Sequence, residues 1–225
     1  MIRAVLLLVL GLAAGCTAPA NRGSNAQILV IGDSLMMWNR SSGQSIGDEL
    51  AIALDRSVVN AAVAGARISN PGVVPPRLEI PAQVIEGDWD WIVMDGGGND
   101  LANECGCDAC STVLDGLISP QGDAGEIPDL VRDLRATGAR VMLMGYYGPS
   151  GRGGPFDGCR DLLSTLDGRL AELAVMESDV FFADAGNAIS SADPSDYDRD
   201  DIHPSPSGSA KIAALLAAAM TTAEQ

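Results

Sequence analysis

The stretch "ILVIGDSLMMWN" at residues 28–39 places four apolar residues directly before Gly-Asp-Ser. A short, continuously apolar run is typical of a parallel strand that is buried on both faces. Gly32-Asp33-Ser34 would then stand at the carboxyl end of this strand, where open parallel sheets bind their ligands. The stretch therefore predicts a buried first strand with a functional serine at its end.

Further apolar segments alternate with helical patterns along the chain. Strands are expected at 27–32, 57–63, 89–95, 139–147 and 179–184, and helices at 44–55, 76–86, 124–137, 159–177 and 205–221. Alternation of this kind predicts a single three-layer α/β domain over residues 27–221, with right-handed crossovers. We find no internal repeat and no sign of a second domain.

The chain of 225 residues is acidic, with a formal net charge of −16 and a hydrophobic content of 47%. This composition fits a globular domain. A surface of this charge repels phosphate backbones, so we expect no nucleic-acid partner. A neutral substrate is easier to reconcile with it.

The first residues have the pattern of an export signal. Residues 1–15 combine Arg3 with an apolar run and small residues before Cys16, which is typical of a signal peptide and too short for a spanning helix. "LAAGC" resembles the lipobox of bacterial lipoproteins, whose cysteine is lipidated; an ordinary secretory signal is the alternative. Residues 16–26 would form a polar tether. We expect an exported protein of the bacterial cell envelope or periplasm, attached to the membrane through lipid on Cys16.

Four cysteines remain once Cys16 is set aside: three in "CGCDAC", at Cys105, Cys107 and Cys110, and Cys159. An even number in an oxidising compartment predicts two disulfides. A zinc site is the alternative, although the spacing lacks the paired knuckles of common zinc modules. A bond between Cys105 and Cys107 would close a strained ring. We therefore expect Cys159 to pair with Cys105 or Cys107, and the other two to pair with each other.

Three residues could provide nucleophilic catalysis. Ser34 needs a base to take its proton, and His203 is the single histidine of the chain. His203 lies between the last strand and the last helix, at the same edge of the predicted sheet as Ser34. Asp200, three residues earlier, can accept the Nδ1–H and leave Nε2 to face the serine. Asp198 and Asp201 are competing carboxylates.

Two residues could stabilise an oxyanion at that edge. Gly65 follows the second strand, and the absence of a side chain lets its N–H approach a ligand closely. Asn99 follows the third strand, and its amide is a plausible second donor. The alternative for both is an ordinary role in a turn.

Taken together, these segments resemble the four blocks of the SGNH (GDSL-type) hydrolase superfamily. The blocks occur in the family's order: Gly32-Asp33-Ser34, Gly65, Gly97-Gly98-Asn99-Asp100 and Asp200-Asp201-Ile202-His203-Pro204. The resemblance covers roughly 27–220 and implies a flavodoxin-like, five-stranded parallel sheet with helices on both faces. It implies that Ser34 is nucleophile and oxyanion donor, that Gly65 and Asn99 are further donors, and that His203 is the base, supported by Asp200. It implies no metal and no cofactor.

The expected activity is that of an exported serine esterase working through an acyl-enzyme. O-acetylated glycans or small acyl esters are the expected substrates; a lysophospholipase, a thioesterase or a non-catalytic glycan-binding lipoprotein are the alternatives. The residues predicted to meet the substrate are Asp33, Leu35, Trp38 and Tyr146. The segments "LMMWN" and "ANECGCDACST" depart from the family's usual sequence, so no relative's specificity carries over. The oligomeric state stays open.

Overall fold

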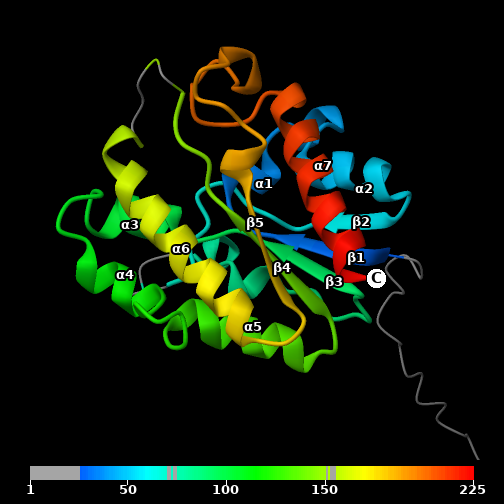
Figure 1. Cartoon of the computed structure of the whole chain (residues 1–225), viewed down its shortest axis with the longest axis horizontal. Coiled ribbons are helices and arrows are strands. Elements are labelled where there is room, and N and C mark those ends of the chain that lie inside the picture. Colours follow the sequence, from blue (N-terminus) through cyan, green and yellow to red (C-terminus); the bar gives the residue numbers. More distant parts are fainter. Residues whose placement is uncertain (1–25, 70–71, 73–74, 151, 153–155) are drawn as a thin grey trace, which may run out of the picture.

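Five strands form one sheet in the order β2-β1-β3-β4-β5, and every pair is parallel (Figure 1). The strands are β1 (Ala26–Ile31), β2 (Ser57–Asn60), β3 (Trp91–Met94), β4 (Arg140–Gly145) and β5 (Val180–Asp184). The computed structural model describes residues 26–69, 72, 75–150, 152 and 156–225. The expected signal peptide and Cys16 lie outside them. The flavodoxin-like sheet confirms the expected fold class.

Helices cover both faces of the sheet (Figure 1). Two helices that pack against each other lie on one face, α2 (Ile46–Leu54) and α7 (Pro206–Ala223). The other face carries α3 (Gly98–Glu104), α4 (Ser111–Leu117), α5 (Glu126–Ala136) and α6 (Arg160–Met176). One further short helix, α1 (Ser34–Met37), directly follows β1. This is the three-layer arrangement that strand–helix alternation predicts.

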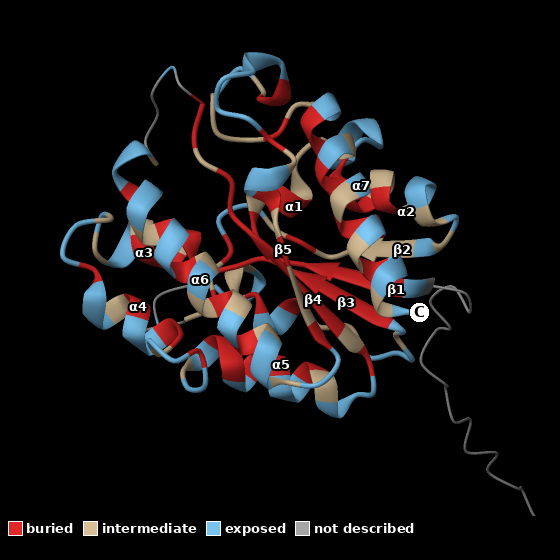
Figure 2. Ribbon diagram, viewed as in Figure 1, coloured by how far each residue is buried: buried red, intermediate tan, exposed pale blue. Residues whose placement is uncertain are grey.

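The core lies between the sheet and its two helical layers, as the buried strands in Figure 2 show. Ile28, Leu29, Val30 and Ile31 are each 0% exposed, so all four apolar residues before Gly32 are buried. Successive side chains of a strand point to opposite faces, and here both faces are covered. The continuous apolar pattern of this strand is therefore a consequence of its central position.

The prediction of a helix at 76–86 is wrong. Two short 3₁₀ turns occupy most of this segment, η2 (Pro76–Leu78) and η3 (Pro81–Gln83). Proline removes a backbone donor and clashes with the preceding turn in a helix interior, but it is tolerated at the first helical position. Pro81 therefore ends any helix begun at Pro76 and starts a new turn. The remaining 3₁₀ turns are η1 (Arg40–Ser42), η4 (Asp157–Cys159), η5 (Ala185–Asn187) and η6 (Pro194–Asp196).

The other four expected helices are present with shifted ends, and three helices were not expected: α1, α3 and α4. Helices α3 and α4 lie in the segment after β3 and are joined across the cysteine-bearing residues 105–110. The second strand is also shorter than expected, since β2 ends at Asn60 and not at residue 63. The backbone N–H groups of Ala61 and Val63 still donate to Val30 and Gly32 of the neighbouring segment, at 2.8 and 3.1 Å.

All five strands end at the same edge of the sheet because all are parallel. The loops that could carry a site are therefore residues 32–34, 61–69, 95–99, 146–159 and 185–205. From β1 the chain moves outward to β2 on one side, and then returns to β3 on the other. This reversal is the topological switch point at which open α/β sheets bind ligands, and Ser34 stands beside it.

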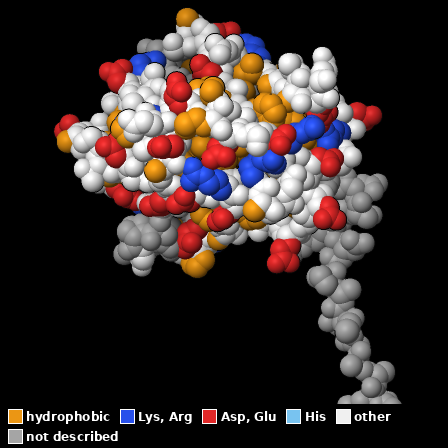
Figure 3. Space-filling view, turned by 60° about the horizontal axis from the view of Figure 1, so that its bottom comes forward, with side chains coloured by type: hydrophobic (Ala, Val, Ile, Leu, Met, Phe, Trp, Pro, Cys, Tyr) orange, Lys and Arg blue, Asp and Glu red, His pale blue; other side chains and the backbone are white. Residues whose placement is uncertain are grey.

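The opposite edge of the sheet carries a network of ion pairs. Arg56 contacts Asp90 at 2.6 Å and Glu224 at 2.8 Å, and Arg135 contacts Asp179 at 2.7 Å. Basic and acidic side chains are interspersed on the face shown in Figure 3. Surface ion pairs of this kind each contribute little to the free energy of unfolding. We therefore assign them a local structural role, at the edge of the sheet away from Ser34.

Within the described part of the chain, we find no helix with the length and apolar character needed to cross a membrane.

Candidate active site

The turn between β1 and α1 is held from both sides. Gly32 has φ +142°, and a Cβ at this position would lie 1.8 Å from Asp95 Oδ1, so only glycine fits. The amide side chain of Gln83 accepts from Gly32 N at 2.7 Å and donates to Gly32 O at 2.9 Å. Ser34 is consequently presented by a fixed turn as the first residue of α1.

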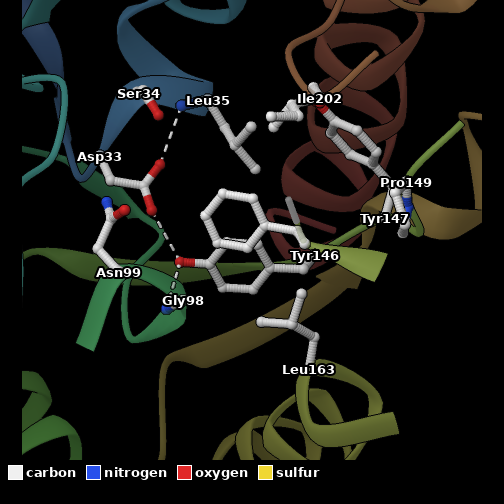
Figure 4. A pocket seen from close by; sticks show the side chains of 11 residues that line it. Asp33, Ser34, Leu35, Gly98, Asn99, Tyr146, Tyr147, Pro149, Leu163 and Ile202 are labelled. Carbon is white, nitrogen blue, oxygen red and sulfur yellow. Dashed lines mark hydrogen bonds between the residues drawn. The ribbon is translucent and has the colours of Figure 1, made fainter. Parts of the chain in front are cut away.

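The residue before Ser34 is buried and fully hydrogen-bonded. Asp33 is 3% exposed and caps α1 by accepting from Leu35 N at 2.9 Å. Its second oxygen accepts from the Tyr146 hydroxyl at 2.9 Å, and this hydroxyl in turn accepts from Gly98 N at 3.0 Å (Figure 4). A single chain of hydrogen bonds therefore joins the turns after β1 and β3 to the end of β4.

Asp95 forms an acid pair with Asp33 beneath this turn. Asp95 Oδ1 accepts from Asp33 N at 2.7 Å, while its Oδ2 is buried and has no hydrogen-bond partner among the described residues. Burial raises the pKa of Asp95 well above its ordinary value, and the charge of Asp33 raises it further. Burial also raises the pKa of Asp33, against the hydrogen bonds from Leu35 and Tyr146. Of the two carboxyls, Asp95 therefore has the greater tendency to keep a proton, and Asp33, which has two donors, the greater tendency to be ionised.

His203 and Asp200 contact each other within one loop. The Nδ1 atom of His203 lies 2.6 Å from Asp200 Oδ2, and Asp200 Oδ1 accepts from the backbone N–H groups of Ile202 and His203 at 3.1 and 3.0 Å. Partial burial opposes ionisation of Asp200, but these hydrogen bonds outweigh it and lower its pKa. An ionised Asp200 selects the His203 tautomer that carries its proton on Nδ1 and leaves Nε2 as acceptor.

The two competing carboxylates have other partners. Asp198 Oδ2 accepts from the indole Nε1 of Trp38 at 2.7 Å, and Asp201 forms an ion pair with Arg152. Backbone contacts close the loop, because Asp198 N donates to His203 O at 2.8 Å. Of the three candidate carboxylates, Asp200 is thus the one that contacts the His203 ring.

A pocket opens beside Ser34 with a volume of about 40 Å³ (Figure 4). Most of its wall is apolar or aromatic. It is lined by Asp33, Ser34, Leu35, Gly98, Asn99, Tyr146, Tyr147, Pro149, Phe156, Leu163 and Ile202. Ile202 immediately precedes His203, so the histidine loop forms one side of this pocket and the serine turn another.

The four residues predicted to meet substrate fall into two groups. Leu35, Asp33 and Tyr146 line the pocket with Ser34, although the Asp33 and Tyr146 oxygens are engaged with each other. Trp38 does not line this pocket; it borders a separate hollow together with Asp198, and its ring stacks on His203. Direct contact of these four with substrate stays a prediction.

The two expected oxyanion donors lie on neighbouring segments. Asn99 lines the pocket, and its Nδ2 donates to Ala66 O at 3.0 Å, which leaves its second N–H. Gly65 precedes Ala66 and has φ +76° in an exposed turn. Asp100 fixes this turn to α3, because it accepts from Ile68 N at 3.1 Å and from Ser69 N at 2.8 Å.

A second, more polar hollow of about 370 Å³ adjoins the pocket and shares Tyr146, Tyr147 and Leu163 with it. Asp167 lies in this hollow and accepts from Tyr146 N through both oxygens, at 3.0 and 3.2 Å. Burial raises the pKa of Asp167 to about 7. Asp167 thereby helps to place the tyrosine that contacts Asp33.

Two disulfides lie beside the site. Cys107 pairs with Cys159 across 52 residues, and Cys105 pairs with Cys110. This is one of the two connectivities that the sequence left open. The longer bridge joins the α3–α4 connection to the turn before α6, the helix that contributes Leu163 to the pocket. Among the described residues, no group of three or more His, Cys, Asp or Glu side chains is placed to hold a metal ion.

Several site residues were missed by sequence reasoning. Asp95 carried a usable signal, since a charged residue directly follows an apolar strand. No sequence signal pointed to Gln83, Asp167 or Leu163, because their roles depend on which loop or strand the fold brings beside them.

An ester hydrolase of the SGNH type is the class of protein that this fold and site define. The chain belongs to the GDSL-like Lipase/Acylhydrolase family, whose model matches residues 30–211.

Solved structures share the fold. An inhibitor-bound aryl esterase from M. smegmatis is 17% identical, with a TM-score of 0.68 over 88% of this chain and 99% of that one. Est24, a carbohydrate acetylesterase from Sinorhizobium meliloti, is 18% identical, with a TM-score of 0.66 over 88% and 99%. A carbohydrate esterase family 2 enzyme from Myceliophthora fergusii is 18% identical, with a TM-score of 0.61 over 92% and 68%. No curated protein matches the sequence.

Proposed function

We propose that this ester hydrolase is a serine esterase for short acyl groups, with O-acetylated glycans or small acyl esters as substrates. Ser34 Oγ attacks the ester carbonyl and His203 Nε2 takes its proton. Asp200 holds the imidazole and stabilises the imidazolium that forms. His203 gives this proton to the ester oxygen, the carbon–oxygen bond breaks, and the alcohol leaves an acyl-enzyme on Ser34. Water then attacks the acyl-enzyme with His203 again as base, the proton passes to Ser34 Oγ, and the acid is released.

The oxyanion of each tetrahedral intermediate needs donors near Ser34. We assign this role to the backbone N–H groups of Ser34 and Gly65 and to the side-chain amide of Asn99. The contact between Asn99 and Ala66 O supports this assignment, because it holds the amide beside the Gly65 turn. Removing one such donor costs about 10²- to 10³-fold in kcat.

The size of the pocket carries the proposal of a short acyl group. On the scale where one water needs about 10–15 Å³, a volume near 40 Å³ accepts a group of roughly three non-hydrogen atoms, the size of an acetyl. Its lining of Leu35, Phe156 and Leu163 suits the methyl end of that group. Similarity to a carbohydrate acetylesterase agrees with acetylated sugars. The long chains of lysophospholipids require more room than this pocket offers, and the larger hollow that adjoins it is more polar.

We also propose that the protein is exported and held at the membrane by lipid on Cys16. The segment "LAAGC" is the basis for this. Two disulfides within the domain are in keeping with an oxidising compartment.

The decisive experiment is a chain-length series of p-nitrophenyl esters, from acetate to palmitate, beside acetate release from acetylated xylan. We expect kcat/KM to be highest for acetate and to fall steadily with length. Ser34→Ala should lower turnover by at least about 10³-fold with an unchanged melting temperature. An optimum at eight carbons or more would replace this proposal with a lipase or thioesterase, and an active Ser34→Ala would remove the nucleophile assignment.

A further inference from the structure

The imidazole of His203 is held on its face as well as on its edge. The ring of Trp38 stacks on it with centroids 3.7 Å apart and planes inclined by 6°. Asp200 contacts the ring edge through Nδ1 at 2.6 Å. The edge contact fixes the tautomer, and the stack restricts rotation of the ring out of its plane.

Trp38 is itself fixed at two points. Its indole Nε1–H donates to Asp198 Oδ2 at 2.7 Å, and its backbone N–H donates to Ser34 O at 2.8 Å as the C-cap of α1. Asp198 N also donates to His203 O. A single turn of helix therefore carries Ser34 at its start and the ring that supports His203 at its end.

The charges around His203 are mostly negative. Asp200 contacts it from its own loop, and buried Asp33 acts on it from the β1–α1 turn. Asp198 lies at the far edge of the indole, and Asp201 is paired with Arg152 from the loop after β4. Tyr147, at the end of β4, stays neutral and donates to Ile202 O at 2.8 Å.

We propose that Trp38, held by Asp198, is a positioning residue for the general base: it orients the His203 ring toward Ser34 and stabilises the imidazolium formed when the serine proton is taken. The inference rests on the proposed function, in which His203 is the base. The face of an indole attracts a cation, and the attraction grows when the pair is shielded from water. The neutral ground state gains less, so the stack favours the transition state.

His203 is the single histidine, so its ring protons give unambiguous NMR signals. We expect these signals to be shifted upfield by the indole, so that they report the stack without any assay of activity. In Trp38→Leu they should move toward the values of a free histidine. Trp38→Phe should keep most of the upfield shift.

Kinetics on the same purified variants, with p-nitrophenyl acetate, test the role. Trp38→Leu should lower kcat by about 3- to 30-fold with KM within twofold, and Trp38→Phe should retain most of the rate. Trp89→Phe is the matched control, because it loses a similar Nε1–H hydrogen bond, donated to Ile85 O at 2.7 Å. Trp89 lies just before β3, at the edge of the sheet away from Ser34. Trp89→Phe should change neither kcat nor the histidine signals.

A double-mutant cycle separates Asp198 from general damage to its loop. Asp198→Ala should lower kcat in the wild-type background only to about the level of Trp38→Phe, and have almost no further effect beside Trp38→Phe, which has no Nε1–H to lose. Equal effects of Asp198→Ala in both backgrounds, or wild-type kcat in a folded Trp38→Leu, would overturn the proposal. If Ser34→Ala stays active while the histidine signals still show the stack, the proposed catalytic function fails and the stacked geometry stands.

Discussion

The hydroxyl of Tyr146 donates a hydrogen bond of 2.9 Å to the buried carboxylate of Asp33, the residue that immediately precedes Ser34. Burial and the charge of Asp33 raise the pKa of Tyr146 well above its ordinary value, so the phenol keeps its proton and acts as donor. The same hydroxyl accepts from Gly98 N, one residue before Asn99. A single phenol thus ties the nucleophile turn to the turn that carries an expected oxyanion donor.

Tyr146→Phe should therefore harm both stability and activity. It removes one donor from a buried carboxylate and one acceptor from Gly98 N, and hydrogen bonds to charged groups contribute about 1.5–3 kcal/mol each. We expect a loss of about 2–3 kcal/mol in the free energy of unfolding and a lower kcat on p-nitrophenyl acetate. Urea unfolding and steady-state kinetics measure the two effects.

Tyr197→Phe is the control for that variant. Its hydroxyl donates to the uncharged Gly148 O, at 2.6 Å, so its loss should cost about 0.5–1.5 kcal/mol. Equal losses for the two tyrosines would show that the Asp33 carboxylate carries no special weight.

Leu163→Ala should change the acyl-chain preference. Leu163 is 6% exposed and lines the Ser34 pocket from α6, so its truncation enlarges the space for the acyl group. We expect the ratio of butyrate to acetate kcat/KM to rise about tenfold, since the two methylenes by which butyrate exceeds acetate gain room, at about 0.8 kcal/mol each. Leu170→Ala, from the same helix and 3% exposed, should destabilise similarly, by about 2–5 kcal/mol, and leave the ratio unchanged. If the butyrate-to-acetate ratio rose equally in Leu163→Ala and Leu170→Ala, the ratio would reflect lost stability, and this role of Leu163 would be contradicted.

Asp167 should make the folded protein less stable as pH rises toward neutrality. Its pKa is about 7 in the folded state, above the value of about 3.9 in an unfolded chain. Between these values the folded state binds more protons, so the free energy of unfolding falls with rising pH. The contribution is fully present below about pH 4 and is lost as pH passes through 7.

Asp167→Asn removes this titration and should flatten the dependence over that window. Other groups, Asp95 among them, contribute to the same range, so the difference between variant and wild type is the quantity to measure. Urea unfolding at intervals between pH 4 and 8 provides it. An identical slope in both proteins would remove Asp167 as the source.

The parts of the fold that followed from the sequence are those governed by local pattern. The run Ile28–Ile31 identifies a central strand because burial on both faces demands apolar side chains at every position. Ser205 and Pro206 indicate the start of α7, and Ser205 accepts from Gly208 N at 3.1 Å as its N-cap. Parallel strands then bring Ser34, Asn99 and His203 to one edge without further information.

The remaining features depend on tertiary contacts that no local pattern encodes. The stack of Trp38 on His203 joins residues far apart in the chain, and the hydrogen bond from Tyr146 to Asp33 does the same. Helix α3 begins at Gly98, in a glycine-rich stretch of low helical propensity that packing overrides. The failure at 76–86 has a local cause that was visible, since Pro81 sits where a helix interior would be.

The bridge between Cys107 and Cys159 should support substrate binding more than chemistry. Cys159 is 2% exposed and is the last residue before α6, which supplies Leu163 to the pocket wall. In the chain-entropy model, a closed loop of 52 residues contributes about 4 kcal/mol. The double variant Cys107→Ser/Cys159→Ser should therefore melt roughly 10 °C lower. Its KM for p-nitrophenyl acetate should rise several-fold while kcat stays within about threefold, because the serine and histidine turns are held by other contacts.

The second disulfide provides the matched control. Cys105 and Cys110 are separated by five residues, so the same model assigns their bridge only about 2 kcal/mol, and it does not join the α3–α4 connection to α6. Cys105→Ser/Cys110→Ser should accordingly lose less stability and leave KM unchanged. Peptide mapping under non-reducing conditions establishes both linkages before the kinetics are compared. Free thiols at Cys107 and Cys159, or a KM that responds equally to the loss of either bridge, would show that the longer disulfide does not hold the pocket wall in place.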